Sequence, residues 1–179
     1  PGPPLLEGNR VETLINGDRI FPSMLQAIAS ARETINFETY IYWSGEIGRE
    51  FAEVLAERSR AGVAVHVLID WVGSQKMEQQ LLDLMTDAGV HVERYHPLHW
   101  YHLARMNNRT HRKLLIVDGR TAFLGGINIS GVYSGGSFSQ GSRARPDGSP
   151  PGRDTHLQLV GPVVAELQKL FLATWEAQK

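Results

Sequence analysis

The chain has no cysteine among its 179 residues, which excludes disulfide bonds and thiolate metal sites but is compatible with any redox compartment. No apolar run approaches the roughly 20 residues of a membrane-spanning helix, and no signal peptide is recognisable. The formal net charge is −1. Proteins that bind nucleic acid usually carry a basic stripe, so this charge disfavours a nuclease.

The chain is rich enough in apolar residues, at 42%, to bury a full core as one domain. Segments with helical periodicity alternate with apolar or alternating runs typical of strands, which predicts a mixed β-sheet sandwiched between α-helices. We expect an extended segment over residues 1–13 and a single α/β lobe over 14–179. The predicted helices are 21–32, with Pro22 in the first turn, 46–61, 77–88 and 162–175. The predicted strands are 34–43, 63–70, 90–95, 114–117, 121–124 and 154–160.

One motif is more informative than any other feature. The run His111-Arg112-Lys113-Leu114-Leu115-Ile116-Val117-Asp118 is followed by Gly125-Gly126-Ile127-Asn128. At average residue frequencies, H-x-K-x-x-x-x-D alone would occur by chance in roughly one chain of this length in a hundred. The added G-G-x-N makes coincidence improbable.

The position of the motif on a strand separates its polar members. Residues 114–117 are continuously apolar and predict a strand buried on both faces, and Asp118-Gly119 predicts a hairpin turn after it. His111 and Lys113 are two residues apart and share a face, whereas Asp118 has the opposite parity. We therefore expect Asp118 to accept backbone N–H bonds in the turn rather than to take part in chemistry. A buried lysine beside His111 argues against an ordinary core histidine.

The motif resembles the HKD signature of the phospholipase D superfamily, in which His111, Lys113 and Asp118 are the eponymous residues. The neighbouring segments INFETYIYWSGEIGREF, RAGVAVHVLID and GRDTHLQLVGP resemble bacterial cardiolipin synthases. The resemblance extends from about Leu14 to Trp175. It implies a phospholipase D-like lobe and a phosphodiester substrate, although related enzymes cleave phospholipids or nucleic acids with the same groups.

The residue types fit covalent phosphoryl transfer. A neutral His111 imidazole can attack phosphorus and form a phosphohistidine. Lys113 and Asn128 would then bind the non-bridging oxygens and stabilise their charge, while Gly126 lets the backbone approach the substrate closely. This chemistry needs no metal or other cofactor if two lysines supply the charge.

Two carboxylates are candidate supporting groups. His111 needs an acceptor on its other ring nitrogen, and Asp154, which opens the strand predicted at 154–160, is the best candidate. The resemblance supports this placement, and the alternative is an exposed aspartate at a strand start. Glu38 stands inside an apolar strand, where it either hydrogen-bonds near the site or faces outward.

The chemistry also needs a second histidine, because an imidazole that attacks phosphorus and is held through its other nitrogen cannot protonate the leaving alkoxide. The chain has no second H-x-K-x-x-x-x-D. In the superfamily, two HKD halves meet across a twofold or pseudo-twofold axis. Since the chain opens with Pro1 rather than methionine and stops at Lys179 after an apparent helix, we interpret it as the N-terminal lobe of a longer enzyme. A homodimer is the alternative.

Two loops frame the motif. Residues 96–109 contain three histidines but no carboxylate, which disfavours a metal site. The loop at 96–109 also carries the apolar and aromatic residues Leu98, Trp100, Tyr101 and Leu103. Together with Trp43 and Trp71, these residues form either a rim that contacts a membrane or contacts within the protein. Residues 134–153 are rich in Gly, Ser and Pro and predict a flexible loop. Relatives carry acidic residues shortly after the Asn-Ile step, and this chain does not.

We therefore expect a phosphatidyltransferase of the cardiolipin-synthase type that acts on phosphatidylglycerol through a phosphohistidine. The alternatives are a phospholipase D-type phosphodiesterase, a dimeric nuclease, and a non-catalytic lobe that binds phosphate or lipid headgroups. The expected partners are the phospholipid, a second HKD lobe and a membrane surface. We expect the full-length enzyme at a bacterial inner membrane and this chain itself to be soluble.

Overall fold

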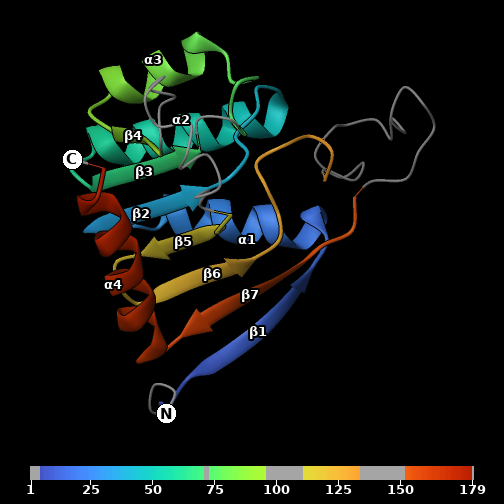
Figure 1. Cartoon of the computed structure of the whole chain (residues 1–179), viewed down its shortest axis with the longest axis vertical. Coiled ribbons are helices and arrows are strands. Elements are labelled where there is room, and N and C mark those ends of the chain that lie inside the picture. The colour runs from blue at the N-terminus through green and yellow to red at the C-terminus, as the bar shows by residue number, and fades with distance from the viewer. Residues whose placement is uncertain (1–4, 71–72, 96–110, 134–151, 179) are drawn as a thin grey trace, which may run out of the picture.

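The computed structural model describes residues 5–70, 73–95, 111–133 and 152–178. Within these residues a seven-stranded sheet has the order β1-β7-β6-β5-β2-β3-β4, and helices cover both of its faces (Figure 1). No helix in the described ranges is long and apolar enough to cross a bilayer. The elements are β1 Arg10–Ile15, α1 Gly17–Ala29, β2 Thr34–Thr39, α2 Glu46–Arg60, β3 Ala64–Asp70, α3 Gln79–Asp87, β4 His91–Tyr95, β5 Leu114–Val117, β6 Thr121–Gly125, β7 Thr155–Val160 and α4 Val163–Glu176.

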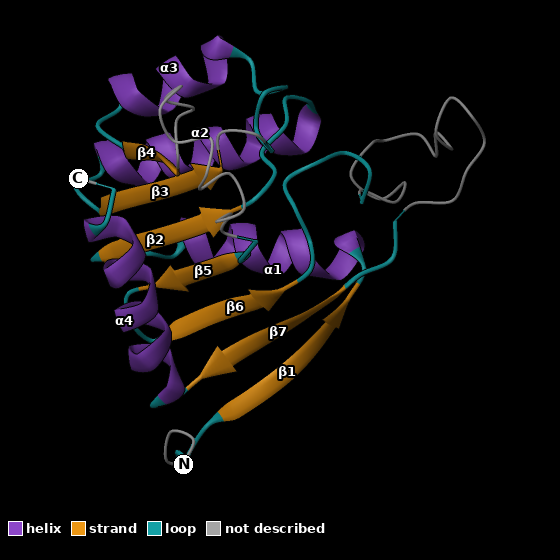
Figure 2. Ribbon diagram, in the orientation of Figure 1, coloured by secondary structure: helices purple, strands orange, loops and turns teal. Residues whose placement is uncertain are grey.

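The sheet separates two apolar cores. The larger core lies under α1, α2 and α3, and the smaller core lies under α4 on the other face (Figure 2). The central strand β5 contributes to both, with Leu115 and Val117 in the larger core and Leu114 and Ile116 in the smaller one. A strand covered on both faces needs apolar residues at every position. The continuous apolar run at 114–117 thus predicted its bounds correctly.

Strand directions determine where the motif lies. Strands β2, β3 and β4 are parallel and are connected through α2 and α3. Strand β5 runs antiparallel to β2, and β6, β7 and β1 continue the sheet in antiparallel fashion. The last residues of β2 and β6 and the first residues of β5 and β7 therefore lie at the same end of the strands, on the right in Figure 2, and we call this end the site edge of the sheet. The predicted α/β lobe with a mixed sheet between helices is confirmed.

Helix α1 differs from the prediction at both ends. It begins at Gly17 rather than Phe21 and ends at Ala29 rather than Arg32. The prediction used Pro22 as a first-turn marker, because proline is favoured there. In the structure, the amides of Arg19 and Ile20 already donate to the carbonyl oxygen of Asn16, so Pro22 lies in the second turn.

The edge strand β1 carried little sequence signal. Only Leu14 of its six residues is buried, so no apolar alternation is visible. Its first four residues fall in the segment expected to be extended. Strand β2 ends at Thr39, four residues before the predicted end, because the chain then leaves the ladder and Tyr42 forms an isolated bridge with Ile129.

The hairpin between β5 and β6 is confirmed. Asp118 and Gly119 both have positive φ, 52° and 60°, like the central residues of a primed turn, and three residues, Asp118 to Arg120, connect the paired Val117 and Thr121. The amide of Arg120 donates to the carbonyl oxygen of Val117 at 3.0 Å and closes the turn. The glycines Gly62 and Gly89, with φ of 93° and 91°, follow α2 and α3 in the conformation expected of helix stops.

Candidate active site

His111 lies just before the central strand β5. Its side chain is exposed at the site edge, where β2 and β6 end. Its ring centroid is 4.8 Å from that of Tyr40, which follows β2. The Lys113 ammonium is 2.9 Å from His111 Nδ1, 3.2 Å from Nε2 and 2.7 Å from the His111 carbonyl oxygen. The predicted common face of His111 and Lys113 thus brings an exposed imidazole against a cation.

Lys113 is buried, with only 4% of its surface exposed. Burial lowers the pKa of its ammonium below the ordinary value, and the negative charge of Asp154 opposes that shift. The ammonium also lies 5.3 Å from the ring centroid of Tyr40, where the aromatic face favours a cation. A desolvated positive charge beside an accessible imidazole is suited to hold an anionic oxygen.

Asn128 follows β6 and is buried at the same edge. Its Oδ1 accepts the Ile41 amide at 3.1 Å, and the Ile129 amide donates to the Ile41 carbonyl oxygen. The acceptor end of the carboxamide is therefore committed to the backbone. Among the described residues no partner occupies its Nδ2 donors, so they can serve a ligand.

Asp154 precedes β7 and lies beside the two glycines. A Cβ at Gly126 would be 2.4 Å from Asp154 Oδ1, so the glycine makes room for the carboxylate rather than for a substrate directly. The same Oδ1 accepts the Thr155 amide at 2.7 Å. In the part of the chain that the structure describes, no hydrogen bond joins Asp154 to His111, so the expected contact is not formed here. Asp154 is instead close enough to Lys113 to influence its pKa.

Asp118 lies at the far end of β5, about 23 Å of extended chain from His111. Its carboxylate accepts the amides of Arg32, Glu33 and Thr34 at 3.0, 2.8 and 3.0 Å. Partial burial acts to raise the pKa of Asp118, but these donors and Arg120 outweigh it and lower the pKa. Asp118 therefore lies away from the other predicted site residues. Its carboxylate fixes the backbone of residues 32–34, which lead into β2.

Glu38 is fully buried on the face of the sheet covered by α4. It accepts Arg112 Nε at 3.2 Å, and Arg112 Nη2 donates to Thr174 Oγ1 in α4. Of the two interpretations of Glu38, the inward one fits this geometry. Because Arg112 lies between His111 and Lys113 in the chain, the ion pair fixes the motif segment from the face of the sheet covered by α4, opposite to Lys113.

His156 was not singled out by the sequence, yet it belongs to this site. It is 1% exposed in β7 and pairs with Gly125. Burial, and after it the charge of Lys113, lowers the pKa of His156 to about 4. The sequence did contain a signal for it: His156 is two residues from Asp154, as Lys113 is from His111, and residues two apart on a strand share a face.

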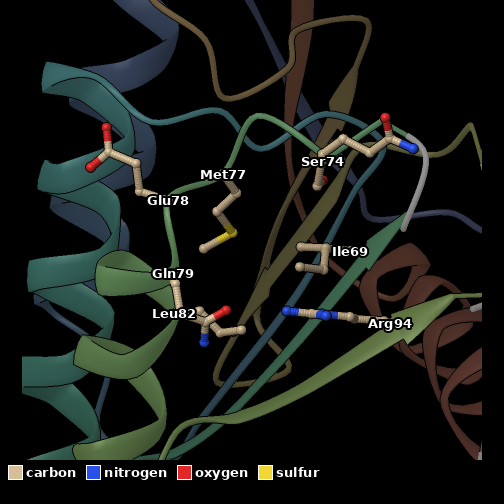
Figure 3. Close-up of a pocket in the computed structure, with 8 residues that line it drawn as sticks. Ile69, Ser74, Met77, Glu78, Gln79, Leu82 and Arg94 are labelled. Carbon is tan, nitrogen blue, oxygen red and sulfur yellow. The ribbon is translucent and has the colours of Figure 1, made fainter.

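Two hollows lie near these elements. One of about 410 Å³ is open and lined by Ile15, Asn16, Arg153, Asp154 and Thr155, beside the candidate site. The other, of about 250 Å³, lies between α3 and the ends of β3 and β4; Ile69, Met77, Leu82 and Arg94 are among its lining residues (Figure 3). None of the predicted site residues lines this second pocket.

Several predictions lie outside the described residues. These are the 96–109 loop with its histidines, Trp71, and most of the loop expected at 134–153. Trp43 is described. Its Nε1 donates to the Gly73 carbonyl oxygen at 2.9 Å, and Lys76 Nζ lies 4.4 Å from the ring centroid. Among the described residues, no three His, Cys, Asp or Glu side chains form a group that would hold a metal ion.

Known proteins resemble the chain in sequence and fold. A family model described as "Cardiolipin synthase, PLD-like domain" matches residues 24–133. Cardiolipin synthase A of Pseudomonas fluorescens is 38% identical over 96% of the chain, and cardiolipin synthase 1 of Bacillus anthracis is 35% identical over 97%. The chain spans 34% and 33% of their lengths, about one third. Nuc, a phospholipase D family member from Salmonella typhimurium, shares the fold, with a TM-score of 0.65 at 17% identity over 96% of this chain and 94% of Nuc.

Proposed function

The chain belongs to the family of phospholipase D-like domains of cardiolipin synthases, and on that premise we propose that it supplies one half of a phosphatidyltransferase active site. The proposed phosphatidyl donor is phosphatidylglycerol. The observation that carries the proposal is the buried Lys113 ammonium held against the exposed His111 imidazole. A nucleophile and a charge that stabilises an oxyanion are two of the requirements of phosphoryl transfer through a covalent intermediate.

In the first step, a ring nitrogen of His111 attacks the phosphorus of phosphatidylglycerol. A P–N bond forms as the P–O bond to the headgroup glycerol breaks, and the glycerol leaves with a proton from a second acid. In the second step, the hydroxyl of another phosphatidylglycerol attacks the phosphohistidine, the P–N bond breaks, and the hydroxyl proton passes to the group that had protonated the glycerol. This step forms cardiolipin and restores His111. If water replaces the second alcohol, the product is phosphatidic acid.

Lys113 and Asn128 are proposed to bind the non-bridging phosphate oxygens. Their donors approach from the residue before β5 and from the segment after β6, and both side chains are buried, so they are oriented before substrate arrives. We retain Asp154 as the proposed acceptor for the His111 ring. Oδ2 is the oxygen available for that role, because Oδ1 accepts the Thr155 amide, and catalytic hydrogen bonds often tighten only when substrate is bound.

The protonated group that serves the leaving glycerol is proposed to be the histidine of a second HKD half. The curated relatives are about three times as long as this chain, so a second half within a longer chain is one source. Another copy of this chain is the other. Either assembly would place its site at a membrane surface, because the substrate is a membrane lipid.

The test is to incubate the protein with phosphatidylglycerol in detergent micelles and to measure lipid products and trapped phosphohistidine by mass spectrometry. His111→Ala removes the nucleophile. His91→Ala is the matched control, because His91 is an exposed histidine at the start of β4, away from the site edge. Gel filtration of the same sample reports the oligomeric state.

Cardiolipin together with a phosphohistidine adduct, both present in His91→Ala and absent in His111→Ala, is the expected result from an assembled site. Phosphatidic acid in place of cardiolipin would assign the activity to hydrolysis. A phosphohistidine adduct that persists in His111→Ala would overturn the proposal. So would the lack of any adduct in wild-type protein that is folded and dimeric.

A further inference from the structure

His156 contacts the segment that carries Asn128. Its ring lies on the same face of the sheet as Lys113, because the cross-strand pairs Gly125–His156 and Phe123–Leu115 place both side chains on the face of the larger core. Its Nδ1 faces the backbone of the glycine segment and accepts the Ile127 amide at 3.5 Å, a long hydrogen bond. Ile127 directly precedes Asn128 and is itself buried. A shift of the His156 ring would therefore be transmitted to Asn128 through one peptide unit.

The ring also determines which residue fits at position 125. A Cβ on Gly125 would lie 2.3 Å from His156 Nδ1 and 2.5 Å from the Thr155 carbonyl oxygen. Both distances are far inside van der Waals contact, so the imidazole packs directly on the Gly125 backbone. The carboxylate of Asp154 packs in the same way on Gly126. Two polar side chains at alternate positions of the β7 segment thus hold consecutive glycines.

The contact requires the uncharged form of His156. A protonated ring has no acceptor, so it would lose the Ile127 amide and would place a second buried cation near Lys113. Burial and the Lys113 charge both favour the neutral ring. Since Nδ1 accepts, the single ring proton is assigned to Nε2.

We propose that His156 is a positioning residue: its neutral ring fixes the Gly125–Ile127 backbone and thereby aims the Asn128 carboxamide at the bound phosphate. The consequence for phosphate rests on the proposed function, whereas the contact with Ile127 does not. His156 itself forms or breaks no bond in the reaction.

Variants of His156 separate the hydrogen bond from packing. His156→Phe retains a ring of similar size and removes the acceptor. His156→Asn places an oxygen near the position of Nδ1 and is the conservative variant. His66→Phe is the matched control, because His66 is a partly buried histidine bonded to Asn36 on the other face of the sheet.

Three measurements follow the contact in isotope-labelled protein by NMR at pH 7: exchange of the Ile127 amide, the Asn128 side-chain amide resonances, and the affinity for inorganic phosphate. In His156→Phe we expect faster exchange, shifted Asn128 resonances and a dissociation constant for phosphate raised about fivefold, the equivalent of one ordinary hydrogen bond. His156→Asn and His66→Phe should stay within about twofold of the wild type. Unchanged Ile127 exchange and Asn128 resonances in a folded His156→Phe protein would overturn the proposal.

The wild-type protein gives a measurement that requires no variant to fold. A long-range proton–nitrogen correlation spectrum should show His156 as the neutral Nε2–H tautomer at pH 7. A charged ring or the Nδ1–H tautomer would overturn the proposal. If the wild type binds no phosphate, the proposed function is contradicted, while the exchange, resonance and tautomer results still decide the role of His156.

Discussion

Arg112 Nε donates to Glu38 Oε1 over 3.2 Å, and this ion pair lies on the opposite face of the motif strand from the Lys113 ammonium. Arg112 and Lys113, the two residues directly before β5, therefore lie on opposite faces of the sheet and in two different environments. Lys113 is directed toward the candidate phosphate site, whereas Arg112 joins β2 to α4. The strand is held from one side and presents its reactive groups on the other.

Removal of Arg112 should destabilise the fold. Arg112→Ala takes a cationic partner from a carboxylate that is fully buried, and we expect the free energy of unfolding to fall by about 2 kcal/mol, less than for a fully buried pair because the Arg112 side chain is 37% exposed. Urea denaturation measures the change. Arg58→Ala is the control, since the Arg58–Glu57 pair is on the surface, where solvent screens ion pairs, and its loss should change the free energy of unfolding much less. Equal losses in the two variants would contradict the prediction.

Lys113 should matter for activity and not for stability. Lys113→Met replaces a desolvated ammonium by an apolar side chain of similar length, so the free energy of unfolding should stay the same or rise. The rate of phosphohistidine formation should fall roughly 100- to 1,000-fold, because the charge on the phosphate oxygens loses its main donor. Rapid-quench mass spectrometry gives the rate. Lys169→Met, an exposed lysine on α4, should retain the wild-type rate.

Asp118 should show the opposite behaviour. Asp118→Ala removes the acceptor for three amides and places alanine at a φ of 52°, so we expect a loss of about 2 kcal/mol in unfolding free energy. Asp118→Asn keeps one oxygen and tolerates the positive φ, and should lose less. Phosphohistidine yield should follow only the folded fraction of each variant. A yield that falls in fully folded Asp118→Asn would show a direct chemical role.

The acid sensitivity of Asp118 has a defined sign. Because its pKa is lower in the folded protein, its contribution is present above the pKa of the unfolded chain and is lost as pH falls through the folded value. The stability difference between wild type and Asp118→Asn should therefore shrink on acidification. A difference that grows toward low pH would be inconsistent with the backbone contacts.

His156 should give a second pH signature. Its pKa is about 4 in the folded protein and 6.5 in the unfolded chain, so the unfolded state binds more protons between these values. Its contribution is complete above pH 6.5 and is lost as pH falls toward 4, by an amount on the order of 3 kcal/mol. In His156→Asn the stability should depend less steeply on pH in this window. Parallel urea-derived curves for the two proteins would refute this.

The sequence predicted the centre of the fold better than its margins. Residues 114–117 are apolar at every position because both faces of β5 are covered, so the strand and its hairpin could be located to the residue. Strand β1 buries only Leu14, so its sequence shows no apolar alternation. Helix α1 begins at Gly17, although proline prefers the first turn and Pro22 lies in the second, so the start of this helix had no local signal either. Gly62 and Gly89 follow α2 and α3 with positive φ, and a glycine after a helical pattern is a signal that a sequence does show.

The site divides in the same way. Parity along one strand sufficed to pair His111 with Lys113 and to set Asp118 apart, because side chains alternate strictly between faces. The bond from Asp154 to His111 was expected from chemistry and is not formed in this structure, where the Thr155 amide is the nearer donor. His156 escaped notice because its role depends on packing against Gly125, and packing between strands is not visible in a single sequence.

The turn at Asp118 has a consequence for how the motif is used in searches. Two of its three named residues carry chemistry in our proposal, and the third fastens the amides of Arg32–Thr34. Selection for a foldable chain would therefore preserve the aspartate after catalysis had been lost. A pseudoenzyme descended from such a domain should keep Asp118 and lose His111 or Lys113 first. The aspartate then reports ancestry, and the histidine and lysine report activity.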